Sequence, residues 1–156
     1  MNSHRCCFTG HRPEKLNISE NEAKIRLHIA IRQAIADGYT TFISGMARGI
    51  DMWAAEIVLE EKENNDSITL VCAPPYEGFQ NRWNEHERNL YDTIINLADV
   101  VKFICPHYSR GCFQIRNCYM VDRSSRVIAA YNEESGGTRN TINYALNKGV
   151  KVINIL

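Results

Sequence analysis

The segment "SGMARGID", residues 44–51, has residue types and a spacing suited to binding a phosphate or a sugar. Gly45 and Gly49 let the chain turn sharply and let a ligand approach the backbone, and a helical pattern of apolar residues starts at Ile50. The first amides of a helix carry partial positive charge and favour a phosphate there. The predicted ligand-binding residues of this segment are Ser44, Gly45, Met46, Gly49 and Asp51.

Asp51 has two interpretations. In the first, its carboxylate accepts hydrogen bonds from a ribose diol that lies behind the bound anion. In the second, the segment is purely structural: Asp51 caps the helix and complements its dipole, and Gly49 allows close packing of helix on strand. The sequence leaves both open.

The segment "TGHRP", residues 9–13, follows the first apolar run of the chain. Gly10 allows close backbone approach, and His11 and Arg12 offer hydrogen-bond donors to an anion. These three residues are predicted to bind ligand, with an ordinary turn carrying solvated charges as the alternative. A lone histidine does not indicate a metal site, and no metal ligand is predicted.

The segment "SGGTRNT", residues 135–141, opens another helical pattern. Gly136, Gly137 and Thr138 are predicted to hold a second phosphate or a sugar at that helix start. A capped turn without a ligand is the alternative.

Two further segments could support such a site. Arg116 shares a helical stripe with Met120 and Arg123, and it is predicted to neutralise ligand charge unless the stripe is a solvated helix face. The segment "PPYEGFQNRW" interleaves aromatic side chains with a cation, and these rings could stack on a base or pack down as a lid. Its residues of interest are Tyr76, Phe79, Arg82 and Trp83.

Short apolar runs alternate along the chain with amphipathic ones. The expected strands are 5–10, 40–44, 67–75, 100–105, 126–131 and 151–156. The expected helices are 20–36, one starting at Ile50, 81–98, 112–125 and 136–149. This order predicts an α/β fold: a Rossmann-like, doubly wound three-layer sandwich with a mostly parallel sheet. Ligands bind at the carboxyl ends of such strands, where the three glycine segments are expected to meet.

Length and charge limit the classes of function. The 156 residues are expected to form a single domain, 1–156. The 18 Lys and Arg balance 18 Asp and Glu, which argues against a global electrostatic hold on nucleic acid or membrane. The sequence shows neither a membrane-spanning run nor a signal-peptide core, so we expect a cytoplasmic protein. The six cysteines lack zinc-site spacing and favour buried, reduced thiols; no cofactor is expected.

The glycine segments resemble a known superfamily. "SGMARGID" resembles the signature of the DprA/Smf DNA-processing proteins, and "R-x-x-x-M" with a later "GGT" resembles motifs of the Lonely-guy phosphoribohydrolases. Both belong to the Rossmann-like SLOG superfamily. The segments "FTGHRPEKL", "GMARGIDMWAAE", "CAPPYEGFQNRW" and "RNCYMVDRSSRVIAAYN" follow the order of its YpsA-like branch. The resemblance extends over nearly the whole chain, and it implies a pocket for a nucleotide-derived ligand such as an ADP-ribose-like molecule.

The chain departs from the Lonely-guy pattern where catalysis is concerned. Thr141 stands where those enzymes carry a glutamate that supports N-glycosidic cleavage, and Asp51 or Asp122 could substitute for it. The glycine motif is also reduced to residues 135–138. No catalytic residue is therefore predicted, and the expected function is a sensor or sequestering module for a nucleotide-derived small molecule. A nucleotide N-glycosidase or phosphoribohydrolase is the alternative, single-stranded DNA binding related to DprA is the second, less expected one, and homo-oligomer formation stays open.

Overall fold

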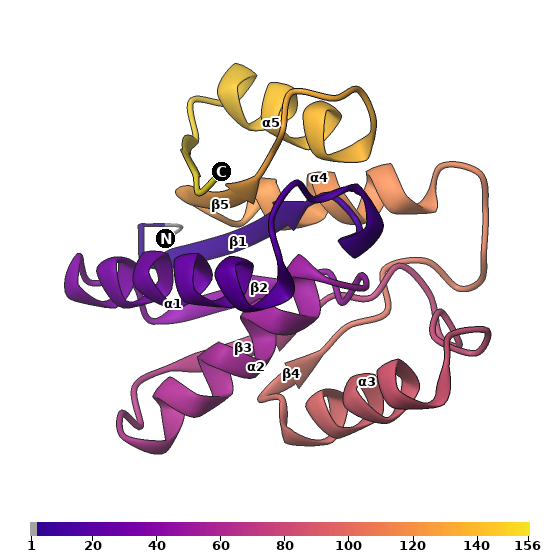
Figure 1. Cartoon of the computed structure of the whole chain (residues 1–156), viewed down its shortest axis with the longest axis horizontal. Coiled ribbons are helices and arrows are strands. Elements are labelled where there is room, and N and C mark those ends of the chain that lie inside the picture. The colour runs from indigo at the N-terminus through magenta and orange to yellow at the C-terminus, as the bar shows by residue number, and fades with distance from the viewer. Residues whose placement is uncertain (1–2) are drawn as a thin grey trace.

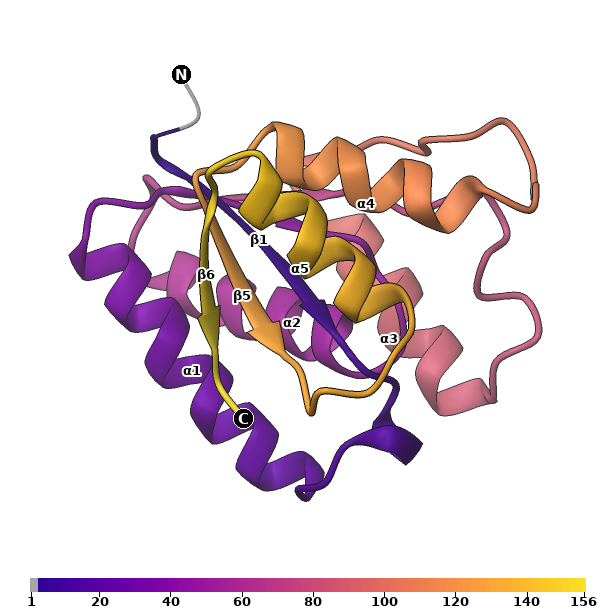
Figure 2. The same ribbon diagram turned by 90° about the horizontal axis from the view of Figure 1, so that it is seen from above.

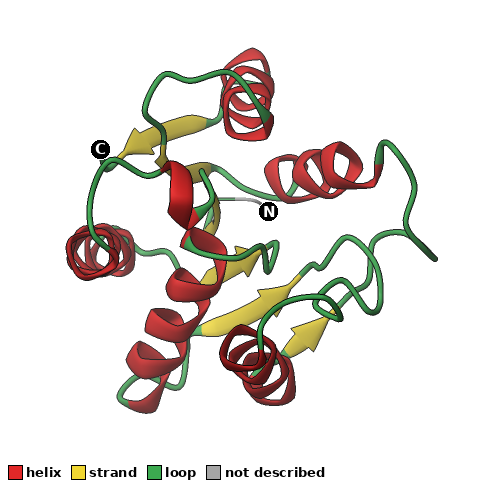
Figure 3. Cartoon of the chain, turned by 45° about the vertical axis from the view of Figure 1, so that its right-hand side comes forward, coloured by secondary structure: helices red, strands yellow, loops and turns green. Residues whose placement is uncertain are grey.

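The computed structural model describes residues 3–156 and contains a single six-stranded sheet in the order β4-β3-β2-β1-β5-β6. All neighbouring strands pair in parallel, which confirms the predicted α/β class (Figure 3). The strands are β1 (Arg5–Gly10), β2 (Thr41–Ser44), β3 (Thr69–Cys72), β4 (Val100–Val101), β5 (Arg126–Ala130) and β6 (Lys151–Asn154). The helices are α1 (Glu20–Ala36), α2 (Ile50–Glu63), α3 (Glu85–Leu97), α4 (Cys112–Asp122) and α5 (Gly137–Asn147), with a short 3-10 turn η1 (Pro13–Lys15).

Helices cover both faces of the sheet, giving the three layers that the sequence predicts. The helices α1, α2 and α3 lie on one face, and α4 and α5 lie on the other (Figure 1). The adjacent residues Cys6 and Cys7 of β1 pack against different helical layers. Cys6 belongs to the apolar cluster with α1 and α2, whereas Cys7 belongs to the cluster with α4 and α5, because successive strand side chains point to opposite faces.

The direction of winding reverses beside β1. From β1 the chain moves outward through β2, β3 and β4, and it then crosses back to place β5 on the other side of β1. The arrowheads of β1 and β5 point the same way and end close together (Figure 2). The carboxyl ends of β2, β1 and β5 are therefore neighbours, and they bring the three glycine segments to one edge of the sheet.

The strands predicted over 67–75 and 100–105 are shorter in the structure, because prolines interrupt their pairing. Beyond β3 and β4 the chains still run together, with the amides of Ile104 and Cys105 bonded to the carbonyls of Pro74 and Pro75 at 3.1 and 2.9 Å. Proline has no N–H to return the bond, so a regular ladder ends there.

The helix predicted over 81–98 begins later, at Glu85. The Asn84 side chain accepts a hydrogen bond from the Glu87 amide at 2.8 Å and so caps the helix, leaving residues 81–83 in the preceding turn. The other predicted ends differ from the observed ones by a few residues, as is common where helices and strands fray. No helix within residues 3–156 is both long and apolar enough to cross a membrane.

Candidate functional site

A cleft of about 520 Å³ lies at the edge of the sheet where β2, β1 and β5 end. It is lined by segments from every part of the chain that the sequence singled out. Its lining residues are Thr9, Gly10, His11, Arg12, Lys15, Ala47, Arg48, Asp51, Phe79, Trp83, Phe113, Arg116, Asn117, Ser135, Gly136, Gly137 and Thr138.

Most of the predicted ligand-binding residues meet in this cleft. Those that line it are Gly10, His11, Arg12, Asp51, Arg116, Gly136, Gly137 and Thr138. Four others lie behind its wall, namely Ser44, Gly45, Met46 and Gly49. Contact between ligand and any of these residues remains a prediction, but the structure gives the latter four a clear supporting role.

Gly45 and Gly49 make room for protein atoms. A Cβ on Gly45 would lie 2.6 Å from Nη1 of Arg116, whose guanidinium donates to the Gly45 carbonyl. A Cβ on Gly49 would lie 2.8 Å from Cδ of Pro13, and the φ of Gly49 is +87°. Gly49 is the N-cap of α2, so Pro13 packs against the start of that helix.

Ser44 fixes the first turn of α2. Its Oγ donates to the Asp51 carbonyl at 2.8 Å and accepts from the Met46 amide at 3.2 Å. The Asp51 carboxylate turns back to accept from the Ala47 amide at 3.3 Å. These bonds hold the loop that precedes α2 and tie it to the first turn of the helix.

Asp51 and Arg116 are two buried residues of opposite charge in the lining of the cleft. Burial raises the pKa of Asp51 to about 6, although the positive charge of Arg116 and the Ala47 amide oppose the rise. Burial also lowers the pKa of Arg116, against the effect of Asp51. A carboxylate with such a pKa in a cleft is typical of a functional residue.

His11 presents a buried imidazole at the cleft. Its ring stacks on Tyr131 with centroids 5.7 Å apart, and Nε2 has no hydrogen-bond partner in the part of the chain that the structure describes. Burial lowers the pKa of His11, Glu134 opposes this and Lys15 adds to it. The ring is therefore neutral at pH 7, with one nitrogen left to donate or accept.

The start of α5 is the open helix terminus of the cleft. Gly136 is its N-cap, with φ +141°, and no side chain caps the first turn. A Cβ on Gly136 or Gly137 would meet no atom within 4 Å, so both glycines face open space. Arg12, whose side chain is 62% exposed, and Lys15 line the same cleft. We call the start of α5 with Gly136 and Gly137, together with Arg12 and Lys15, the phosphate side of the cleft.

Aromatic rings form another part of the lining. Phe79, Trp83 and Phe113 line the cleft, with ring centroids 5.1 Å apart for Phe79–Trp83 and 5.7 Å for Phe79–Phe113. Tyr76 packs edge-on against Phe79 from behind, and neither it nor Arg82 lines the cavity. We call the rings of Phe79, Trp83 and Phe113 the aromatic side of the cleft. Phe113 was missed from the sequence, because only the tertiary structure brings α4 beside the loop after β3.

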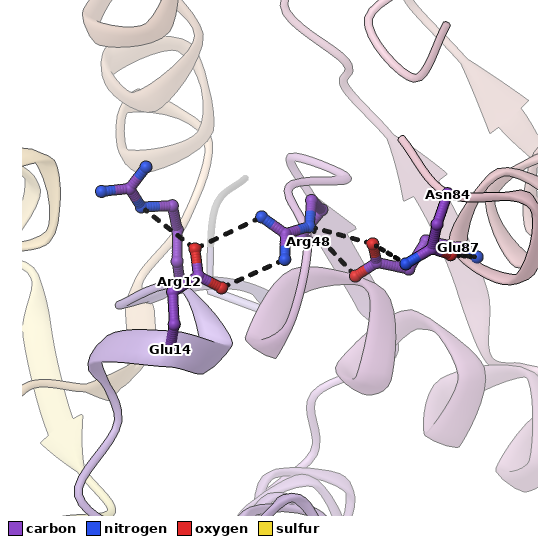
Figure 4. Close-up of polar contacts among 5 residues, drawn as sticks. All are labelled: Arg12, Glu14, Arg48, Asn84 and Glu87. Carbon is purple, nitrogen blue, oxygen red and sulfur yellow. Dashed lines mark hydrogen bonds and ion pairs between the residues drawn. The ribbon is translucent and has the colours of Figure 1, made fainter. Parts of the chain in front are cut away.

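Glu14, Arg48 and Glu87 form a charged network at the cleft, which we call the rim network and which the sequence did not reveal (Figure 4). The Arg48 guanidinium lies between two carboxylates: its Nε is 3.0 and 3.1 Å from the oxygens of Glu87, and its Nη2 is 3.1 Å from Glu14. Asn84 Nδ2 donates to Glu87 at 2.9 Å, and Glu14 also faces Arg12 at 4.0 Å. Arg48 lay within a quoted motif, but its partners are far away in the sequence.

The carboxylates proposed as catalytic substitutes differ in position. Asp51 is the one Asp or Glu in the cleft lining among the described residues. Asp122 accepts from the Tyr144 hydroxyl at 2.7 Å and lies outside this lining. Thr141 is buried and donates to the Gly137 carbonyl at 2.8 Å, so it supports the start of α5. Across residues 3–156, no cluster of three His, Cys, Asp or Glu residues could hold a metal.

Known proteins share this fold. DprA from Streptococcus pneumoniae superposes with a TM-score of 0.67 and 20% identity, covering 95% of this chain and 48% of that one. DprA from Helicobacter pylori, described for its single-stranded DNA binding mode, superposes with a TM-score of 0.66 and 16% identity, covering 95% and 63%. This chain thus spans about half to two thirds of those proteins, and the likeness shows a common fold.

Sequence comparison identifies the family. A UPF0398 protein of Staphylococcus aureus strain JH9 is 30% identical over 134 residues, which cover 81% of this chain and 72% of that protein. The YpsA model, described as the YspA SLOG family, matches residues 6–152. The chain therefore belongs to the YpsA SLOG family.

Proposed function

We propose that the cleft binds a nucleotide-derived small molecule of the ADP-ribose type, as a sensor or sequestering module. The observation that carries this proposal is the presence in one cleft of a phosphate side and an aromatic side. The loops follow the strand order along the sheet edge, so the loop after β3, the start of α2 and the loop after β5 come in sequence. A ligand of this type has a base for the loop after β3, a sugar for the start of α2 and a phosphate for the loop after β5.

Each part of the ligand has a chemically suited partner. The free amides at Gly137 and Thr138 suit a phosphate, and Arg12 and Lys15 add positive charge. Asp51 suits a ribose diol, because a carboxylate accepts hydrogen bonds from two hydroxyls. The rings of the aromatic side suit the faces of a base.

A thermal-shift screen tests this proposal. The ligands are AMP, ADP-ribose, cyclic ADP-ribose isomers and NAD, and the recovered ligand is analysed for cleavage. A hundredfold excess over the dissociation constant stabilises the folded protein by about 2.7 kcal/mol. A shift with intact ligand supports the sensor. A shift with release of free base makes the protein an N-glycosidase, with Asp51 as its candidate carboxylate. No shift with any nucleotide contradicts the proposal.

The contribution of the base is measured with Phe113→Ala. Loss of this ring should weaken AMP binding by roughly 5- to 150-fold, because stacking a base on an aromatic ring contributes about 1–3 kcal/mol. Binding of ribose 5-phosphate, which has no base, should change little. Phe103→Ala is the matched control, since Phe103 is 39% exposed and Phe113 38%, but Phe103 lies outside the cleft. Equal losses for both ligands would contradict base stacking.

Single-stranded DNA binding is the second candidate, favoured by the DprA fold over 95% of the chain. Phe113 in the cleft lining and Tyr108, which packs against it, also leave aromatic surface exposed. If the protein binds a short oligothymidylate, the logarithm of its affinity should fall steeply with that of the salt concentration. Competition by AMP would locate that binding in the cleft, whereas binding without competition would assign the strand to another surface.

A further inference from the structure

The rim network connects the two sides of the cleft. Glu14 belongs to η1, between the cleft-lining residues Arg12 and Lys15 of the phosphate side. Glu87 lies in the first turn of α3, just after Trp83 of the aromatic side, and it is held there by the Asn84 cap. Arg48 spans the gap between these two carboxylates (Figure 4).

We infer that Arg48 is a positioning residue: the Glu14–Arg48–Glu87 bridge fixes the separation between the phosphate side and the aromatic side, and so selects ligands long enough to contact both. The inference rests on the proposed function of the cleft. It assigns Arg48 a role different from that of Arg12 and Lys15, which the proposed function assigns to direct contact with the phosphate.

The hydrogen bonds of Arg48 support this distinction. Its Nε donates to both oxygens of Glu87, and its two terminal nitrogens donate to Glu14 at 3.4 and 3.1 Å. Two carboxylates thus face one guanidinium, and a phosphate brought to it would also meet their negative charge. The paired guanidinium keeps its donors in a fixed plane, which suits it to hold two carboxylates at a set distance.

Energetic reasoning says which ligands such a bridge favours. A ligand with two binding groups gains affinity from the second contact only when the protein holds both contacts at the matching separation. Inorganic pyrophosphate reaches the phosphate side alone, and adenosine lacks the phosphate. Their affinities should therefore not depend on the separation that the bridge fixes, whereas the affinity for AMP should.

The test measures AMP, pyrophosphate and adenosine binding by calorimetry for the wild type, Arg48→Met and Glu87→Gln. We expect the ratio of AMP affinity to pyrophosphate affinity to fall about tenfold in each variant, because a changed charge at the cleft affects the two anions alike, and adenosine binding to stay within about twofold of the wild type. The double variant should lose no more than either single one, because both changes open the same bridge. Glu61→Gln is the control, since Glu61 pairs with Arg32 at 2.9 Å, away from the cleft.

The ratio of AMP affinity to pyrophosphate affinity separates positioning from direct anion binding. If Arg48 binds the phosphate directly, Arg48→Met weakens AMP and pyrophosphate binding alike and leaves the ratio of the two affinities unchanged; this result would overturn the inference. Unchanged AMP binding in both variants would also overturn it. If Arg48→Met fails to fold, Glu87→Gln and Arg48→Lys give the same contrast. A wild type that binds none of the probes would contradict the proposed function itself, and this inference with it.

Discussion

Asp51→Asn should unfold at a higher temperature than the wild type at pH 8 and bind its nucleotide more weakly. The pKa of Asp51 rises from 3.8 to about 6 in the folded protein because the carboxyl group is buried. Ionisation of this group therefore costs folding free energy, about 3 kcal/mol for a difference of roughly two pKa units. Asparagine keeps an oxygen for the Ala47 amide but carries no charge.

The pH dependence follows from the direction of this shift. The folded protein holds the Asp51 proton more tightly than the unfolded chain, so the stabilisation is full below about pH 4 and disappears as the pH rises through about 6. The advantage of Asp51→Asn should thus be absent at pH 4 and reach its full size, about 6–12 °C in melting temperature, above pH 7. Thermal denaturation at several pH values measures it.

Asp99→Asn is a control of opposite sign. Burial raises the pKa of Asp99, but hydrogen bonds from Lys62 and the Leu70 amide outweigh this effect, and the net pKa is lowered. Loss of that charge should destabilise the protein at pH 8. If Asp51→Asn were also destabilised at pH 8, the Asp51 carboxylate would be a structural ion. Greater stability together with lost ligand binding is the result expected of a residue kept for function.

The sequence was sufficient to predict the fold and the edge of the sheet at which the cleft lies, because both depend on local patterns. Alternating apolar runs and amphipathic stretches indicated a doubly wound sheet, and glycines after three of these runs marked the edge where the cleft lies. The two prolines that follow β3 are likewise visible in the sequence. Their effect on β4 was missed because it arises between two strands far apart in the chain.

The partners of individual residues could not be predicted in this way. Gly45 was interpreted as a point of ligand approach, but the atom that a side chain there would strike belongs to Arg116, 71 residues later. Arg48 is not among the residues predicted to bind ligand, and its partners Glu14 and Glu87 lie 34 and 39 residues away in the sequence. Close packing and charge pairing are properties of the tertiary structure, and the same motif letters fit either role.

Gly10→Ala should destabilise the protein by about 1–3 kcal/mol, because side-chain atoms of Ile50 already occupy the space that the added methyl group needs. An added Cβ would lie 2.7 Å from Cβ and 2.9 Å from Cγ2 of Ile50, the buried first residue of α2. These atoms are attached close to the helix backbone, so relief requires α2 to shift. Chemical denaturation measures the change, and Gly111→Ala is the control because its Cβ would meet nothing within 4 Å.

The same substitution distinguishes the two roles of Gly10, packing and ligand approach. If packing is decisive, Ile50→Ala should partly relieve the strain, so that the double variant loses less stability than the sum of the single ones. Ligand affinity should fall in Gly10→Ala as well, since Asp51 follows Ile50 and would move with it. If instead stability is unchanged and only affinity falls, Gly10 is needed for the ligand and not for the packing of α2. The contacts with Ile50 favour packing, with the position of Asp51 as its consequence for binding.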